Sequence, residues 1–376
     1  MANIPDDILH LCILPRLPVK SLTRFKSVSK SWQTLISCPD FIRLHHRHAL
    51  SSDENRLLIV SDDGLSPGFH VHELDSLLAP PLLLTYPGPA TCTKQVDVKV
   101  VASCDFFLLL SCSLRHTESS PTDALVLLNP STGSYYEIRH QSKPIGSDLT
   151  IYGLYHDDAN DDFKIVRITD CFFRLAIREI MVYTFKTNSW KLIERKLDTF
   201  YAMACDIAVI GHLLHTVFRF LSTGSEEIRI CCFDIVAERW TNDIPLPEYM
   251  VNTCRSYEDL FVLDSSLLCV AGENKEEMGT YSVWVMKEYG VKESWVKLMD
   301  IDVNRCCWGY FPITYRTGSR HELLCKPACR LLCWYNIRDN ESKYVKFDGY
   351  KPISLHVCKG SLVTFPGGQR INLHRF

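Results

Sequence analysis

The sequence predicts a small all-α module over residues 1–48, followed by an all-β propeller domain of about six blades over residues 49–376. Three observations predict this fold. Apolar residues recur at helical spacing up to His48, and short strand-like runs follow it. Asn, Asp, Gly and Ser separate those runs, as in strands joined by turns. A pattern of strand, polar turn and aromatic residue then repeats about every 50 residues, a period typical of propeller blades.

Four short helices account for the N-terminal module. The first carries two acidic residues in its first turn, where the helix dipole favours them, and it ends because Pro15 cannot continue it. The later helices each place apolar residues three and four apart on one face. The expected helices run from Pro5 to about Leu14, over residues 18–26, after the N-cap Ser29, and from near Pro39.

The first helix is apolar on almost every side. From Ile8 to Leu14 the chain reads ILHLCIL, and a helix apolar all round has to be buried. A module of this size buries its own core only marginally. Two explanations stay open on this basis: the surplus apolar side chains form an exposed patch for a partner, or the module packs on the rest of the chain.

The segment IPDDILHLCILPRLPVKSLTRFKSVSKSWQTLISCPDF resembles an F-box. It has the acidic helix start, the R-L-P-x-K-S-L-x-R-F core and the V-S-K-x-W helix of that family. It departs from the family at Ile4, where Leu is usual, and at Pro15. In the family this module docks on a Skp-type adaptor of a cullin–RING ubiquitin ligase. The resemblance implies adaptor contacts at Ile4, Pro5, Ile8, Leu14, Leu17, Pro18, Leu22, Val28 and Trp32.

Five segments of the β region share one plan: an apolar strand, a polar turn, and an aromatic residue that opens the return strand. The aromatics are spaced by 55, 50, 55 and 49 residues, which predicts kelch-like blades with these rings in the blade core. The two ends of the domain, near Leu57 and Leu362, are expected to share a closing blade, so that no sheet edge stays open. The repeated aromatics are Tyr135, Trp190, Trp240, Trp295 and Tyr344.

The propeller segments resemble the plant F-box-associated domain. The sequence has no Trp-Asp dipeptide, and its only Gly-Gly pair lies near the C-terminus. LLNPSTGSYYEI, YGLYHDDANDDFKIVRI, VYTFKTNSWKLIE and VWVMKEYGVKESWVKL resemble signature lines of that domain, in its order. Two lines depart from it: ASCDFFLLL replaces the usual G-S-C-N-G-L line, and Thr216 follows His215 where Trp is usual.

Two plant subgroups share the motifs VWVMKEYGVKESW and GSLVTFPGG. One contains the pollen S-locus F-box proteins of self-incompatibility, which recognise stylar S-ribonucleases. The other contains immune-regulatory F-box proteins that target resistance receptors. The motifs do not separate the two, so both target classes stay open.

Three polar clusters are candidates for ligand sites. HDDANDDF lacks the Gly and the final Glu of an EF-hand loop, so we expect a hairpin turn there rather than a calcium site. HHRH, residues 45–48, is expected to be a solvated helix end. Seventeen cysteines without a C-x-x-C pair predict reduced core thiols, among them Cys325, Cys329 and Cys333. No metal, no cofactor and no catalytic residue is expected.

Charge and composition limit the classes of partner and the cellular locations that we expect. A net charge of −3 gives no electrostatic reason to expect binding to nucleic acid or to an anionic membrane. Acidic residues precede the apolar run at Ile8, where a signal peptide needs basic ones. We therefore expect a cytoplasmic or nuclear protein.

The sequence thus predicts a non-catalytic substrate receptor of an SCF-type E3 ligase. The module would dock the adaptor, and through it cullin and RING subunits, while the propeller captures a protein for ubiquitination and proteasomal degradation. The alternatives are a scaffold or inhibitor that binds without ubiquitination, and, much less favoured, a propeller glycan hydrolase. The expected target-facing loops are residues 139–149, 169–179, 219–227, 250–257 and 272–280.

Overall fold

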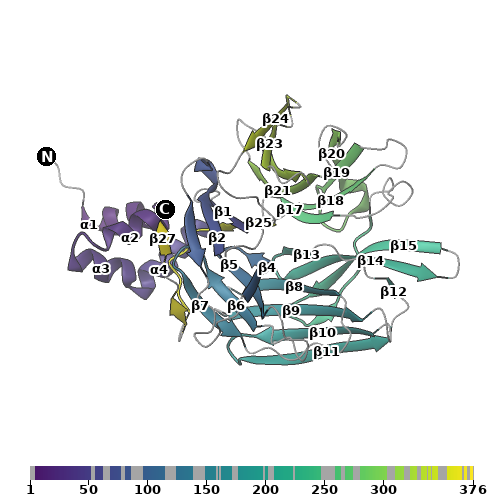
Figure 1. Ribbon diagram of the computed structural model, residues 1–376, viewed down its shortest axis with the longest axis horizontal. Coiled ribbons are helices and arrows are strands. Elements are labelled where there is room, and N and C mark those ends of the chain that lie inside the picture. Colours follow the sequence, from purple (N-terminus) through teal and green to yellow (C-terminus); the bar gives the residue numbers. More distant parts are fainter. Residues whose placement is uncertain are drawn as a thin grey trace. The chain divides into compact units, whose positions relative to one another are not determined.

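A computed structural model shows helices at the N-terminus and antiparallel sheets after them (Figure 1). The chain divides into two compact units, Met1–His140 with Tyr350–Phe376, and Gln141–Gly349. The structure describes residues 5–51, 56–61, 68–77, 81–85, 96–114, 124–138, 149–157, 160, 162–171, 177–197, 200–201, 207–222, 225–246, 259–263, 267–273, 280–302, 310–316, 322–327, 332–336, 338–339, 341–345, 354–365, 368–370 and 373–375.

The first unit opens with the helical module, residues 5–51, and its helices lie where the sequence places them. Ser29 caps α3 as expected, because its hydroxyl accepts a hydrogen bond of 3.2 Å from the Trp32 amide. The helices are α1 (Asp6–Ile8), η1 (Leu9–Ile13), η2 (Leu14–Arg16), α2 (Val19–Phe25), α3 (Lys30–Ser37) and α4 (Pro39–Ser51).

The first helix changes its winding instead of stopping at Leu14. Residues Leu9–Ile13 form a π turn, closed by a bond from the Leu14 amide to the Leu9 carbonyl, and Leu14–Arg16 form a 3₁₀ turn. In a continuous α-helix the ring of Pro15 would clash with the carbonyl of Leu11. The wider turn before the proline removes that clash and carries the helix through to Arg16.

Two sheets complete the first unit. The first sheet, in the order β25-β1-β2-β3-β27, joins both ends of the domain, with Leu57 opposite Cys358. The expectation of a shared closing blade is therefore confirmed. Its strands are β25 (Ser354–Lys359), β1 (Arg56–Ser61), β2 (Gly68–Glu73), β3 (Leu82–Thr85) and β27 (Leu373–Arg375), and the second sheet contains β26 (Gln369–Arg370), β7 (Ser134–Ile138), β6 (Ala124–Asn129), β5 (Phe107–Leu114) and β4 (Val96–Cys104).

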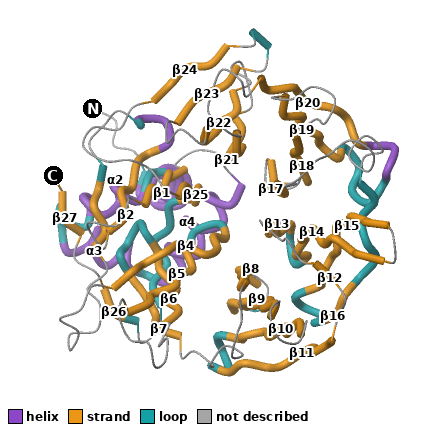
Figure 2. The backbone as a smooth tube through the Cα atoms, turned by 45° about the vertical axis from the view of Figure 1, so that its right-hand side comes forward, coloured by secondary structure: helices purple, strands orange, loops and turns teal. Residues whose placement is uncertain are grey.

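The second unit contains four sheets among its described residues, each with its strands in chain order from one edge to the other (Figure 2). They are β8 (Leu149–Asp157), β9 (Asp162–Cys171), β10 (Ile177–Thr184) and β11 (Ser189–Leu197); β12 (Phe200–Tyr201), β13 (Ile207–Ile210), β14 (Leu213–Ser222), β15 (Ser225–Asp234) and β16 (Arg239–Trp240); β17 (Asp259–Leu263), β18 (Leu267–Glu273), β19 (Thr280–Met286) and β20 (Trp295–Asp302); and β21 (Tyr310–Arg316), β22 (Glu322–Pro327), β23 (Leu332–Asn336) and β24 (Glu341–Val345).

Buried apolar clusters join successive sheets within each unit. In the second unit, Val166 and Ile180 pack with Leu214 and Phe233 of the next sheet. Further clusters join that sheet to the sheet of β17–β20, and the latter to the sheet of β21–β24. In the first unit one cluster joins its two sheets in the same way. Four-stranded meanders packed face to face by apolar residues are the construction of propeller blades.

Two of the five repeated aromatics are buried in the blade core, as predicted, and Trp190 and Trp240 are half-buried. Tyr135 and Trp295 are buried, and the indole of Trp295 donates to the Pro245 carbonyl at 2.8 Å. Tyr344 does not follow the predicted plan, because its side chain is 44% exposed. Tyr344 stands opposite Cys333, two residues further along its strand than Ser342, which stands opposite Tyr335. The prediction of a core ring at Tyr344 is wrong.

Candidate functional site

The helical module exposes apolar side chains that a globular protein normally buries. Among the described residues of the module, Ile8, Leu11, Ile13 and Val28 are 47%, 59%, 37% and 65% exposed. We call these four residues the exposed apolar set. Three of them lie in the run that the sequence shows as apolar on every side. Covering such side chains with a partner removes apolar surface from water, which is favourable.

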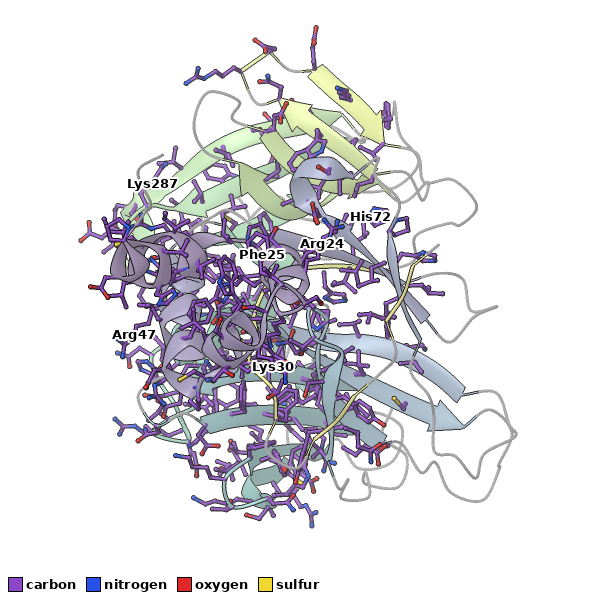
Figure 3. The ribbon with its side chains drawn as sticks, turned by 90° about the vertical axis from the view of Figure 1, so that its left-hand side faces the viewer. Arg24, Phe25, Lys30, Arg47, His72 and Lys287 are labelled. Atoms are coloured by element: carbon purple, nitrogen blue, oxygen red, sulfur yellow. The ribbon has the colours of Figure 1, made fainter. Side chains whose placement is uncertain are left out.

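The turn between α2 and α3 holds Val28 outward. The Val28 amide donates to the Phe25 carbonyl at 3.0 Å, and Ser29 begins α3 directly after it. Behind the turn, the rings of Phe25 and Trp32 meet edge to face with centroids 5.3 Å apart. Figure 3 shows the module with its side chains, and labels Arg24 and Phe25 on α2 and Lys30 on α3. The aromatic pair gives the exposed valine a rigid base.

The structure separates the predicted adaptor contacts by exposure. Pro5, Ile8 and Val28 are exposed, and Leu17, Pro18 and Trp32 are half-buried. Leu14 and Leu22 are 1% and 0% exposed and belong to the core of the module. Ile4 lies outside the described residues. Leu11 and Ile13 were not among the predicted contacts, although the all-round apolar run that contains them was the signal that could have found them.

His45 of α4 fixes the loop that carries Leu17 and Pro18. Its Nε2 lies 3.1 Å from the Leu17 carbonyl oxygen, and burial lowers the pKa of the imidazole. Because a carbonyl can only accept, Nε2 carries the hydrogen and donates it. His46 is buried too, with its ring 4.4 Å from that of Phe106. The expectation of a solvated helix end at residues 45–48 is therefore wrong for these two histidines, because α4 continues to Ser51 and packs them inward.

The polar cluster HDDANDDF of the propeller is structural. In HDDANDDF, Asp157 accepts from both the amide and the side chain of Asn160, and Asp162 accepts from the Phe163 and Lys186 amides. The expected hairpin turn between β8 and β9 is therefore confirmed. Among the described residues, no group of three or more His, Cys, Asp or Glu side chains is arranged to hold a metal ion.

The described cysteines are reduced thiols, and several are buried in the sheets. Cys231 and Cys232 are 6% and 1% exposed, as expected of core thiols. Burial raises the pKa of Cys358 to about 12 and raises that of Cys231 further. A raised pKa keeps a thiol protonated, so these two side chains act as small apolar groups and not as nucleophiles.

Strand direction defines the sheet ends at which the described strands beside the predicted target-facing loops stop. In an antiparallel meander, the connection between the second and third strands and the exit from the fourth strand lie at the same end. Residues 169–179 and 272–280 connect second and third strands, whereas 139–149 and 250–257 follow fourth strands. Residues 219–227 are corrected from a loop to a hairpin, because β14 and β15 pair out to Ser222 and Ser225.

Comparison with known proteins agrees with this architecture. Residues 1–44 match the F-box domain, and residues 65–355 match the F-box associated beta propeller domain. The Arabidopsis thaliana F-box protein CPR1 is 26% identical over 404 aligned residues, which cover 99% of this chain and 92% of that protein. The Arabidopsis F-box/kelch-repeat protein At3g23880 is 26% identical, with 80% of this chain and 79% of that protein covered.

Solved propellers are more distant. The Dos1 propeller is 12% identical, with a TM-score of 0.38, and the aligned region covers 77% of this chain and 68% of the Dos1 chain. The SapL1 lectin is 8% identical with a TM-score of 0.42 and covers 80% of this chain and 97% of its own. Scores this low carry no argument about function. Among the described residues, none of the helices has both the length and the apolarity to cross a membrane.

The predicted fold class, a helical F-box module followed by a propeller of six blades, is confirmed by these matches and by the six described sheets. The propeller match alone spans more than half of the chain, and the relatives named above are Arabidopsis F-box proteins. The chain therefore belongs to the plant F-box proteins that carry an F-box-associated β-propeller domain.

Proposed function

We propose that this protein is the substrate receptor of an SCF-type ubiquitin ligase. The observation that carries the proposal is the exposed apolar set on a module that matches the F-box domain. A Skp-type adaptor is the partner expected of such a module, and it links the receptor to cullin and RING subunits. The chain contributes proximity: it holds a target near the ubiquitin-charged enzyme and performs no chemistry itself.

The adaptor surface combines the exposed apolar set with the half-buried Leu17, Pro18 and Trp32. Each large apolar side chain that an adaptor buries completely contributes about 1.5–3 kcal/mol. Leu14 and Leu22 support this surface from within, because they hold the helices together. Of the nine adaptor contacts predicted from the sequence, these two are thus proposed to act indirectly.

The target is proposed to bind at the loop end of the propeller sheets. The supporting observation is that, in the second unit, the predicted loops 169–179 and 272–280 both fall between the second and third strands of their sheets, so the described strands that border them end at equivalent sheet ends. A protein held there would be ubiquitinated and degraded. The proposed target classes are an S-ribonuclease and an immune receptor, after the two subgroups whose motifs the sequence shares.

Adaptor binding is the first experiment. Ile8→Asp places a carboxylate in the proposed interface, and an unpaired buried charge costs several kcal/mol. We expect the affinity of the full-length protein for a purified plant Skp-type adaptor to fall at least about 100-fold, measured by calorimetry. Val296→Asp is the matched control, since Val296 of β20 is 46% exposed against 47% for Ile8.

The outcomes separate the ligase receptor from the scaffold. Tight binding by wild type and Val296→Asp, lost in Ile8→Asp, supports the receptor. Absence of binding by a folded wild-type protein contradicts it. A scaffold or inhibitor would give a different pattern. A candidate target would bind Ile8→Asp as well as it binds wild type, and the reconstituted ligase would ubiquitinate that target to the same extent with or without this protein.

A further inference from the structure

A leucine from the end of the chain completes the core of the helical module. Leu362 is 4% exposed and belongs to the same buried cluster as Leu14, Leu22, Ile36 and Phe41. More than 300 residues separate it from the last of these in sequence. The sequence alone offered packing of the module on the rest of the chain as one explanation for its surplus of apolar residues, and Leu362 shows that this packing occurs.

The segment around Leu362 is held by the side chain of one asparagine. Asn129, 0% exposed, donates from Nδ2 to the carbonyls of Ser361 at 3.1 Å and Val363 at 2.8 Å. Its Oδ1 accepts from the Ser131 amide at 2.9 Å, which fixes the orientation of the amide group. The side chain of Asn129 thus hydrogen-bonds the backbone on both sides of Leu362.

Four more hydrogen bonds fix the segment along its length. The amides of Ser361 and Phe365 donate to the hydroxyls of Ser131 and Ser134, each at 3.2 Å. The amide of Lys359 donates to the Asp105 carbonyl at 2.6 Å, and its Nζ donates to the Leu50 carbonyl of α4 at 2.7 Å. Residues 359–365, which we call the C-terminal strap, therefore bond to the turns after β4 and β6 and to the last helix of the module.

Aromatic rings provide a second connection beside the strap. The ring of His46 on α4 lies 4.4 Å from Phe106, and Phe107 of the same turn lies 5.3 Å from Phe365 of the strap. Phe106 and Phe107 are both 0% exposed. The helices, the hairpin of β4 and β5 and the strap thus share one packed region, in agreement with their place in one compact unit.

We propose that the C-terminal strap is a structural part of the F-box module and that the module gains its binding-competent form only when the strap is seated. The core of the module contains Leu362 together with residues of η2, α2, α3 and α4, so an empty strap site leaves a cavity in that core. The receptor would then engage the ligase only after its propeller is complete. The link to adaptor binding rests on the proposed function, whereas the link to the fold of the module does not.

Hydrogen exchange in the full-length protein tests the proposal. We expect Leu362→Ala to speed exchange of the amides in α2 and α3 about 30-fold or more, because truncating a buried leucine leaves a cavity. Leu324→Ala is the matched control: Leu324 is equally buried, in β22 of the other unit, and should leave these amides unchanged. Leu362→Met, which conserves volume, should restore nearly wild-type exchange.

Adaptor affinity is measured on the same variants. The proposal expects Leu362→Ala to bind the Skp-type adaptor at least tenfold more weakly and Leu362→Met to bind as wild type does. Unchanged exchange of α2 and α3 in a folded Leu362→Ala protein overturns the proposal. If wild type fails to bind the adaptor, the proposed function fails, but the exchange data still decide whether the strap belongs to the module. Should Leu362→Ala fail to fold, Leu362→Val, with one methylene fewer, takes its place with a smaller expected effect.

Discussion

Tyr289, in the connection between β19 and β20, and His215, in β14 of another sheet, share a hydrogen bond of 2.6 Å between the phenol oxygen and Nε2. His215 Nδ1 lies 3.1 Å from the Ala208 carbonyl, so Nδ1 carries the hydrogen and Nε2 accepts from the tyrosine. The thiol of Cys232, 3.6 Å from the phenol oxygen, then donates to it. The three side chains form one directed chain of hydrogen bonds, in which Cys232 donates to Tyr289 and Tyr289 donates to His215. This chain joins two blades.

Removing the tyrosine hydroxyl tests this chain. Tyr289→Phe leaves the buried Nε2 of His215 without its donor, which costs about 1–3 kcal/mol. Urea unfolding of the full-length protein measures the change in free energy. Tyr344→Phe is the control matched in exposure, since Tyr344 is 44% exposed against 45% for Tyr289, and it should change the free energy of unfolding by less than about 0.5 kcal/mol. Equal effects of the two substitutions would contradict the directed chain.

Acid should destabilise the protein through its buried histidines. Burial lowers the pKa of His215 and of His72 to about 4, and lowers that of His45 as well. A histidine whose pKa is lower in the folded state takes up its proton first in the unfolded chain as the pH falls. Its contribution to the free energy of unfolding is therefore complete above about pH 6.5 and is lost as the pH falls toward 4. We expect a loss of about 2 kcal/mol per histidine of this kind at pH 5.

Chemical unfolding at pH 7 and pH 5 measures this loss. His215→Gln should reduce the dependence on pH by the contribution of one histidine. His212→Gln is the control, because the side chain of His212 is 50% exposed. The expectation fails if both variants keep the full dependence.

A buried ion pair in the β8–β11 sheet gives a third prediction. Arg167 and Glu179 have side chains 0% and 4% exposed and lie 2.9 Å apart. Glu179→Gln leaves the arginine charge buried without its partner, so we expect a loss of about 3–5 kcal/mol in unfolding free energy. Arg195 pairs with the same carboxylate but is 59% exposed, so Arg195→Gln should cost no more than about 1 kcal/mol. If Arg195→Gln lost more unfolding free energy than Glu179→Gln, the prediction would be contradicted, because the exposed pair would then contribute more to stability than the buried one.

Thr216 offers a stabilising substitution. This residue stands where related domains usually have Trp, it is 0% exposed, and its hydroxyl has no hydrogen-bond partner among the described residues. Thr216→Val removes a buried polar group and keeps the shape, so the unfolding free energy should rise by about 1 kcal/mol. Thr23→Val on α2 is the control, because the Thr23 hydroxyl donates to the Val19 carbonyl at 2.8 Å, and its loss should destabilise.

The sequence predicted the order of the elements well because local rules set them. The N-cap at Ser29, the turn at Asp157 to Asp162 and the shared blade at Leu57 all follow from short patterns or from the need to close a sheet edge. The departing line ASCDFFLLL, for which the sequence made no structural prediction, forms the hairpin of β4 and β5, with Asp105 in the left-handed turn position at a φ of 40°.

Orientation was harder to predict because it depends on residues distant in the sequence. Periodicity shows that Leu14 and Leu22 are apolar, but it does not show whether they face the core of the module or a partner, and Leu362 helps to decide this. The exposure of His46 on α4 was predicted wrongly for the same reason, since Phe106, in the turn between β4 and β5, packs against its ring. The contacts with the adaptor and the target stay predictions.

The pairing of β1 with β25 also has a consequence for synthesis on the ribosome. The two strands start about 300 residues apart, at Arg56 and Ser354, and translation adds roughly 5–20 residues per second. The N-terminal helices therefore wait roughly 15–60 s, with the place of Leu362 in their core unfilled, before Leu362 emerges. During that interval the nascent chain presents an apolar surface that chaperones can bind, and a premature stop before residue 362 leaves it in that state.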